Sequence, residues 1–85
     1  MIALVGIMVY SQDATERVNA ILHDYRNVIA GRMGLPMREK GVNVICVVLE
    51  TDSAKINALT GKLGATQGVR AKALYGLPAD TQTEK

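Results

Sequence analysis

The stretch from Val42 to Leu49, with the sequence VNVICVVL, decides the fold of this chain. It is rich in β-branched residues and too short for a helix of ordinary length, so it predicts a strand. Because side chains alternate between the two faces of a strand, both faces of this one are apolar, with Asn43 as the exception. A strand of this kind has to be covered on two sides.

The composition indicates one small, folded domain. The chain has 85 residues, of which 48% are hydrophobic, and this excludes disorder for its body. A net charge of +2 is too small to predict binding to nucleic acid or to an anionic membrane. The apolar start, Met1 to Tyr10, lacks the layout of a signal peptide and is too short to span a bilayer. With a single cysteine and therefore no intramolecular disulfide, these features predict a reducing, cytoplasmic setting and no membrane association.

The first half of the chain predicts a strand, a helix and an edge strand. Residues Ile2 to Tyr10 form the first strand, and Gly6 within it suggests a bulge or a close approach by a neighbouring backbone. The pattern Asp13-x-x-Glu16 has the form of a capping box and predicts a helix that ends near Tyr25. Its apolar face consists of Ala14, Val18, Ile21, Leu22 and Tyr25. Residues 27–37 contain glycines and a proline, which favour an edge strand with a bulge, and 38–41 predict a turn.

The second half predicts one more helix and one more strand. Thr51, Asp52 and Ser53 are candidate N-caps, and an apolar stripe leads to a helix end at Gly64. Gly61 inside this helix costs about 1 kcal/mol relative to Ala, so close packing is expected there. Residues 69–75 form the last strand, with Arg70 and Lys72 on its half-exposed side. Residues 77–85 are polar and predict a flexible tail.

The resulting order, βαββαβ, predicts an α+β fold of the ferredoxin-like, ACT-like kind. In this two-layer sandwich a four-stranded antiparallel sheet carries two helices on one face, and the first and third strands are central. The helices leave the other face of an apolar sheet bare, and exposed patches of this kind usually mark interfaces. We therefore expect a homo-oligomer, a dimer or a tetramer, formed through the open face or one of its edges.

Three segments resemble the iron-only hydrogenase system regulator family. They are 19–36 with the sequence NAILHDYRNVIAGRMGLP, 38–41 with REKG, and 59–64 with LTGKLG. The resemblance extends to Tyr75 and implies a single ACT-like regulatory domain over residues 1–76. That family is similar to the ligand-sensing C-terminal domain of the nickel-responsive regulator (NikR). The resemblance implies a regulatory role and carries over no cofactor and no catalytic residue.

Arg32, next to Gly31 and near Gly34, is the main candidate for ligand binding. Small neighbours allow close approach, and a guanidinium can bind a carboxylate or phosphate through two parallel hydrogen bonds. Our hypothesis is that Arg32, His23 and Tyr25 border an effector pocket at a subunit contact. The simpler alternatives are an ion pair of Arg32, for instance with Glu50, and an interaction of His23 with the carbonyls at its helix end.

No metal site is predicted. The nickel-responsive regulator uses several His and a Cys, whereas this chain has one of each. A site shared between subunits by His23 and Cys46 is the open alternative, and equilibrium dialysis against nickel, zinc and iron tests it. Cys46 lies among Val and Ile, where a cysteine usually acts as a small hydrophobe. The run Gly61 to Gly64 lacks the spacing of a P-loop.

Three classes of function compete. An enzyme is not expected, because paired carboxylates and a nucleophile beside a base are missing. A nucleic-acid binder, including a regulator acting directly on DNA, is the alternative. RNA-recognition domains of this topology stack bases on strand aromatics, yet Phe and Trp are absent here, and Met1 leads straight into a strand. We expect a regulatory binding module that acts through a small-molecule effector or a protein partner.

Overall fold

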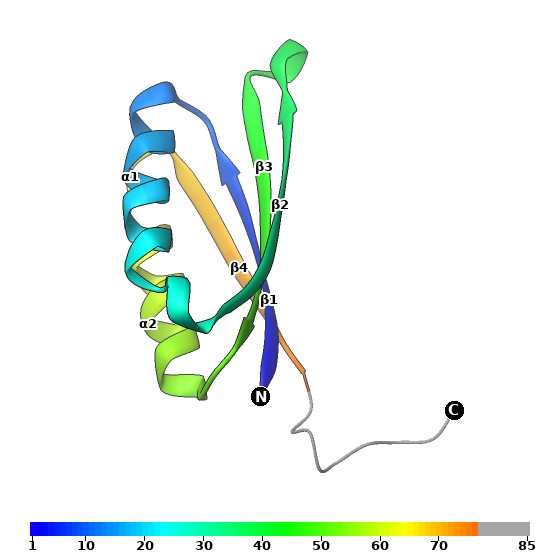
Figure 1. Ribbon diagram of the computed structural model, residues 1–85. Helices are drawn as coiled ribbons and strands as arrows, with labels where there is room; N and C mark the ends of the chain where they lie inside the picture. The colour runs from blue at the N-terminus through cyan, green and yellow to red at the C-terminus, as the bar shows by residue number, and fades with distance from the viewer. Residues whose placement is uncertain (77–85) are drawn as a thin grey trace, which may run out of the picture.

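The computed structural model describes residues 1–76 and confirms the two-layer sandwich (Figure 1). Strand β1 (Ile2–Val9) is followed by helix α1 (Gln12–Asp24), a 3-10 turn (Arg26–Val28) and β2 (Ile29–Met37). A second 3-10 turn (Arg38–Lys40), β3 (Val42–Glu50), α2 (Ser53–Gly64) and β4 (Val69–Tyr75) complete the fold. The sheet order is β2-β3-β1-β4, all neighbours are antiparallel, and both helices cover one face. The expected tail, 77–85, lies outside the described residues.

The two doubly apolar strands are the central ones, as predicted. Strand β1 pairs with β3 without interruption, from Ile2 opposite Glu50 to Val9 opposite Asn43. Every second side chain of these strands points towards the helices and is buried, except for the half-buried Asn43, and along β4 the same alternation continues with half-buried Ala71 and Ala73. The core is entirely hydrophobic and consists of Ala3, Val5, Ile7, Val9, Ala14, Val18, Leu22, Ile45, Val47, Leu49, Ile56, Leu59, Leu63 and Val69.

Helix α1 begins earlier than the capping-box pattern indicated. Ser11, not Asp13, is the N-cap: its backbone is extended, and its hydroxyl accepts a hydrogen bond from the amide of Ala14 at 3.1 Å. This hydroxyl satisfies a donor at the free end of the helix, which is the role predicted for Asp13. Asp13 instead lies in the first turn, where its charge complements the helix dipole.

The glycines behave in three different ways. Gly41 has a φ of 70°, which closes the turn before β3. The close packing expected at Gly61 is wrong, because a Cβ there would meet nothing within 4 Å. A bulge at Gly6 is also wrong, since the pairing of β1 is continuous on both sides. The nearest atom to a Cβ at Gly6 is the carbonyl oxygen of Lys72 at 4.0 Å.

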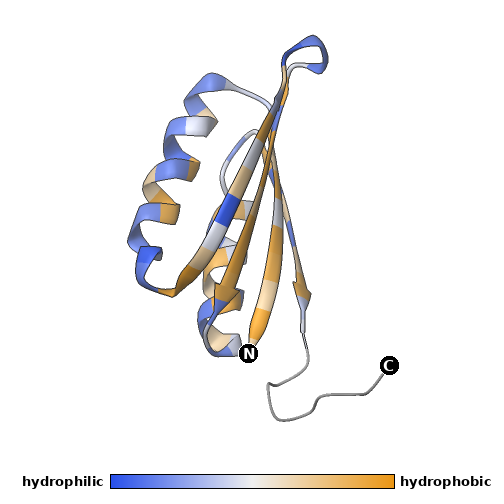
Figure 2. Ribbon diagram, turned by 45° about the vertical axis from the view of Figure 1, so that its right-hand side comes forward, coloured by the Kyte–Doolittle hydropathy of each residue, from blue (hydrophilic) through white to orange (hydrophobic). Residues whose placement is uncertain are grey.

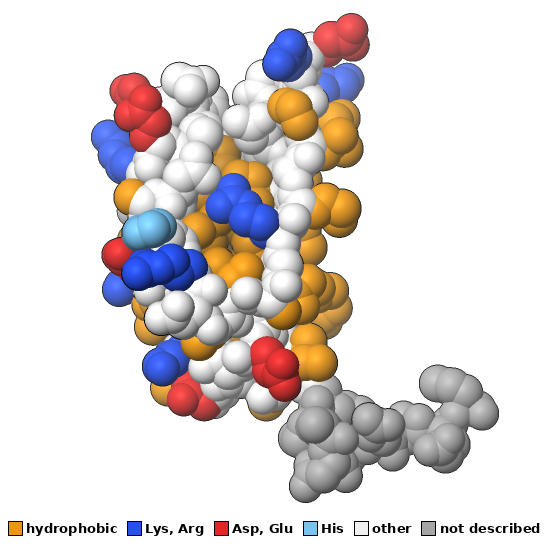
Figure 3. Space-filling view, in the orientation of Figure 1, with side chains coloured by type: hydrophobic (Ala, Val, Ile, Leu, Met, Phe, Trp, Pro, Cys, Tyr) orange, Lys and Arg blue, Asp and Glu red, His pale blue; other side chains and the backbone are white. Residues whose placement is uncertain are grey.

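The face of the sheet away from the helices is open and apolar. Hydrophobic residues run along its strands in Figure 2, and Figure 3 shows hydrophobic side chains along the flank opposite the helices. The most exposed are Met33 at 68%, Leu74 at 67% and Leu35 at 60%. None of the helices within residues 1–76 has the length and apolarity needed to cross a membrane.

Candidate functional site

A hollow of about 320 Å³ separates helix α1 from the edge strand β2. We call it the basic hollow. It is lined by Asn19, Leu22, His23, Arg26, Ile29 and Arg32. Figure 3 shows a basic side chain lying over a hydrophobic floor in the recess between α1 and β2. The hollow therefore combines positive charge with an apolar base.

Local structure explains why these side chains meet. Asn19, Leu22 and His23 have the spacing of one helical face at the end of α1, and Arg26 follows in the 3-10 turn beside them. On β2, Ile29 pairs with Leu49 and Arg32 with Val47, and both of these partners face the helices. Residues three apart on a regular strand point to opposite faces. The register shift between Ile29 and Gly31 adds one residue to β2 and thereby brings Ile29 and Arg32 to the same face. The bulge therefore turns Arg32 into the hollow.

Both arginines of the basic hollow bond to neutral oxygens. Arg32 Nη2 donates to Asn19 Oδ1 at 3.1 Å, across the hollow from β2 to α1. Arg26 Nη1 donates to the backbone oxygen of His23 at 2.9 Å. The expected pair of Arg32 with Glu50 is therefore replaced by a bond to an amide, and Arg26 takes the carbonyl interaction proposed for the helix end. Each guanidinium has five N–H donors, so most remain available to a ligand.

Two of the three predicted site residues come together. His23 and Arg32 both line the basic hollow, and both are solvent-exposed. Tyr25 does not line it: its ring packs partly against the core, and the ammonium of Lys62 lies 5.2 Å from the ring centroid. Sequence reasoning missed Asn19 and Arg26, although their spacing of four and three residues from His23 indicates a shared helical face.

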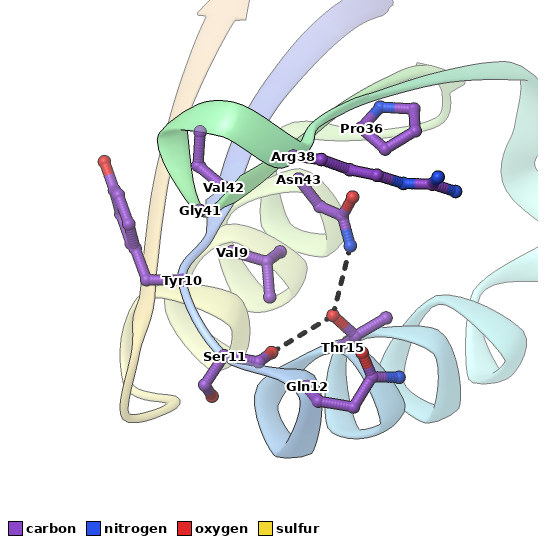
Figure 4. A pocket seen from close by; sticks show the side chains of 10 residues that line it. All are labelled: Val9, Tyr10, Ser11, Gln12, Thr15, Pro36, Arg38, Gly41, Val42 and Asn43. Atoms are coloured by element: carbon purple, nitrogen blue, oxygen red, sulfur yellow. Dashed lines mark hydrogen bonds between the residues drawn. The ribbon is translucent and has the colours of Figure 1, made fainter.

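A second hollow, of about 340 Å³, opens between the first turn of α1 and the β2–β3 turn (Figure 4). Its polar groups largely bond to one another: Asn43 Nδ2 donates to Thr15 Oγ1 at 3.4 Å, and Thr15 Oγ1 donates to the Ser11 backbone oxygen at 3.1 Å. Arg38 is the basic residue of its lining. With fewer free groups and less charge, this hollow is the weaker candidate for an anion.

Comparison with known proteins places the chain among its relatives. Residues 1–73 match the model of the TM1266-like family, whose description gives it a provisional role as an iron-only hydrogenase system regulator. The chain belongs to this family. The structure of uncharacterized protein TM1266 from Thermotoga maritima is similar, with 39% identity, a TM-score of 0.83, and coverage of 86% of this chain and 92% of that one. Among curated proteins, no match was found.

The fold of this TM1266-like chain also occurs inside an enzyme. A formyltetrahydrofolate deformylase from Pseudomonas putida KT2440 matches with a TM-score of 0.65 and 18% identity. The match covers 89% of this chain and 29% of the deformylase. At that identity the likeness shows a shared fold and nothing about the reaction. The family description itself is that of a regulator, not of an enzyme.

Metal-ligating residues do not cluster in the part of this family member that the structure describes. Within residues 1–76, no group of three or more His, Cys, Asp or Glu side chains could hold a metal ion. His23 and Cys46, which were considered above as a shared metal site, also lie apart within one chain. Cys46 pairs with Gly6 and Met33, on the open face of the sheet, whereas His23 lies on a helix that covers the other face.

Proposed function

We propose that this chain is a ligand-sensing regulatory module, and that its basic hollow binds a small anion carrying a carboxylate or phosphate group. The observation that carries the proposal is the position of Arg32. Its guanidinium reaches across the hollow and donates to a neutral amide, with the buried side chain of Leu22 in the lining. An apolar floor lowers the local dielectric and strengthens hydrogen bonds between charged groups.

Exchange of the amide for an anion is favourable at this position. Arg32 now donates to a neutral oxygen, whereas a bond to an anion joins two opposite charges, and a guanidinium can form two such bonds in parallel. Asn19 keeps a role after the exchange, because its Nδ2 group is a donor that can bind the same anion. Arg26 and His23 lie in the same lining and supply further donors.

The bound anion would connect α1 to β2. Asn19, His23 and Arg26 belong to the end of the helix and its following turn, whereas Arg32 belongs to the edge strand. A ligand that bonds to both elements fixes their relative position, and a ligand shifts an equilibrium by its differential affinity for two states. In our proposal a protein partner responds to that difference, so the chain regulates by contact with another protein.

A titration of backbone amide NMR signals tests the proposal, with inorganic phosphate and succinate as the probes. We expect saturable shifts around Asn19 and Arg32, and at least about tenfold weaker binding for Arg32→Ala, since a charged hydrogen bond is lost. Arg17→Ala is the matched control: it removes the same charge from an exposed position of α1 outside the hollow.

Three results would overturn the proposal. The first is an unchanged affinity of Arg32→Ala for both anions. The second is an equal loss of affinity in Arg17→Ala, which would indicate a general effect of charge. The third is the absence of saturable shifts at the basic hollow with either probe.

A further inference from the structure

Gly6 lies where a glycine has no evident reason within its own chain. A glycine inside a strand costs stability, because it loses the most conformational freedom on folding and brings no side chain to pack. The usual reasons for a glycine do not apply here. Gly6 does not have a positive φ, and its strand has no bulge. A Cβ at this position would make only an ordinary contact, 4.0 Å from the carbonyl oxygen of Lys72. This leaves close approach by a second molecule as the reason for the glycine.

Gly6 also occupies the centre of the open face. It pairs with Cys46 on β3 and with Lys72 on β4, and Cys46 pairs in turn with Met33 on β2. This row crosses the middle of the sheet, and its members Gly6 and Cys46 are the two smallest residues that the central strands place on the open face. Larger side chains flank them, Leu4 and Val48 on one side and Met8 and Val44 on the other. The centre of the open face therefore carries its shortest side chains, and we call the pair of Gly6 and Cys46 the Gly6 centre.

We propose that two copies of this chain pack open face to open face, with Gly6 of each copy opposite Cys46 of the other, so that the two sheets approach closely at the Gly6 centre. The face spans about 19 Å across four strands and about 26 Å along them, roughly 500 Å² before side-chain relief is counted. A standard interface buries about 800 Å² on each partner and the lower limit is about 1,000 Å² in total, so two such faces reach that limit before side-chain relief is counted. Its apolar content is typical of the core of such an interface.

The charges on the open face determine how the copies align. Arg70 and Lys72 lie on it along β4, and its acidic residue, Glu50, lies at the far end of β3. A two-fold axis across the strands would stack β4 on its own copy and bring like charges together, which is unfavourable. A two-fold axis along the strands places β4 of each copy over β2 of the other. The alkyl stems of Arg70 and Lys72 then cover exposed apolar side chains, and their charged ends reach the rim.

Sedimentation equilibrium of the full chain without added anions tests the dimer, and its outcome does not depend on the proposed effector. We expect wild type to weigh twice 9.1 kDa at micromolar concentrations. Gly6→Val should weaken dimerisation about a hundredfold or more, because the overpacking occurs twice across the axis. Gly34→Val is the matched control: a Cβ there also has its nearest contact at 4.0 Å, but it pairs with Ile45 on the helix side.

Two variants of Met33 that carry opposite charges test the alignment, and they remain informative if Gly6→Val fails to fold. In the proposed dimer Met33 faces Lys72 of the second copy, so Met33→Lys should abolish dimerisation and Met33→Glu should preserve it. With the two-fold axis across the strands, β2 would lie on β2 of the second copy, and both variants would repel their own copies. The thiol of Cys46 gives a second readout, since its rate of modification by N-ethylmaleimide should fall as wild-type concentration rises.

Several results would overturn the proposal. A wild-type chain that stays at 9.1 kDa, or a folded Gly6→Val variant that dimerises like wild type, contradicts the interface. An equal loss of dimer in Gly34→Val contradicts the role of the Gly6 centre. Equal loss of dimer in both Met33 variants contradicts the alignment.

Discussion

Asn19→Asp is the most direct test of the basic hollow, because it alters charge and almost nothing else. The two side chains have nearly the same shape, so the new carboxylate takes the position of an amide that already accepts from Arg32 Nη2 at 3.1 Å. Arg32 then has a charged partner within its own chain. An external anion has to compete with that partner for the same guanidinium.

Two terms set the size of the effect. A surface ion pair contributes about 0–1 kcal/mol, which the anion must overcome to displace it. The displaced carboxylate then lies about 6 Å from the anion, where two like charges repel by about 0.7 kcal/mol in water and by about 3 kcal/mol at an effective dielectric of 20. Together they amount to about 1–4 kcal/mol, and we expect binding about fivefold to several hundredfold weaker.

The assay is the same NMR titration with phosphate and succinate, run alongside thermal unfolding. The variant should unfold at the same temperature as wild type or slightly above it, which separates lost binding from lost structure. Affinities that match those of wild type would refute the reasoning, because they would place the anion away from Arg32. Asp13→Asn serves as the control, since it alters charge in the first turn of α1, outside the lining of the hollow.

Three further predictions concern stability and can be measured by thermal or urea unfolding. Ser11→Ala should lower the free energy of unfolding by about 1 kcal/mol, because it removes the acceptor for the Ala14 amide. An unchanged midpoint would indicate that Asp13 caps the helix instead. Gly61→Ala should stabilise the fold by up to about 1 kcal/mol, as its Cβ meets nothing; a loss of stability would indicate hidden packing. Gly68→Ala should destabilise by about 1 kcal/mol or more, since φ is 83° and the Cβ would lie 3.3 Å from Ser11 Oγ; tolerance would show that the turn can rearrange.

Alternation of side chains explains why the sheet could be predicted from sequence. The residues from Val42 to Leu49 are apolar on both sides, and this pattern placed β3 in the centre and left one face open. The start of α1 was predicted two residues too late, because Ser11 and Asp13 are both good caps and only the backbone geometry distinguishes them. Local signals of this kind determine which elements form more reliably than where they begin.

The candidate site was only partly predictable, because it depends on contacts between elements. The sequence identified His23 and Arg32, but the partner that it offered for Arg32 in the alternative of an ion pair was Glu50, where the structure has Asn19. A bulge was expected in β2, yet its position decides which face Arg32 occupies, and sequence pattern alone did not fix that position. Tyr25 was grouped with these residues by proximity in sequence, whereas the end of the helix turns its ring towards Lys62.

The bulge in β2 has one more consequence. With Arg32 turned into the hollow, the next residue, Met33, emerges on the other surface of the same strand, so one peptide bond joins the two. If binding of an effector at one end of that bond changes the affinity for a second copy at the other, thermodynamic reciprocity requires the second copy to change the affinity for the effector by the same factor. The amount of protein in the cell would then tune the concentration of metabolite to which it responds.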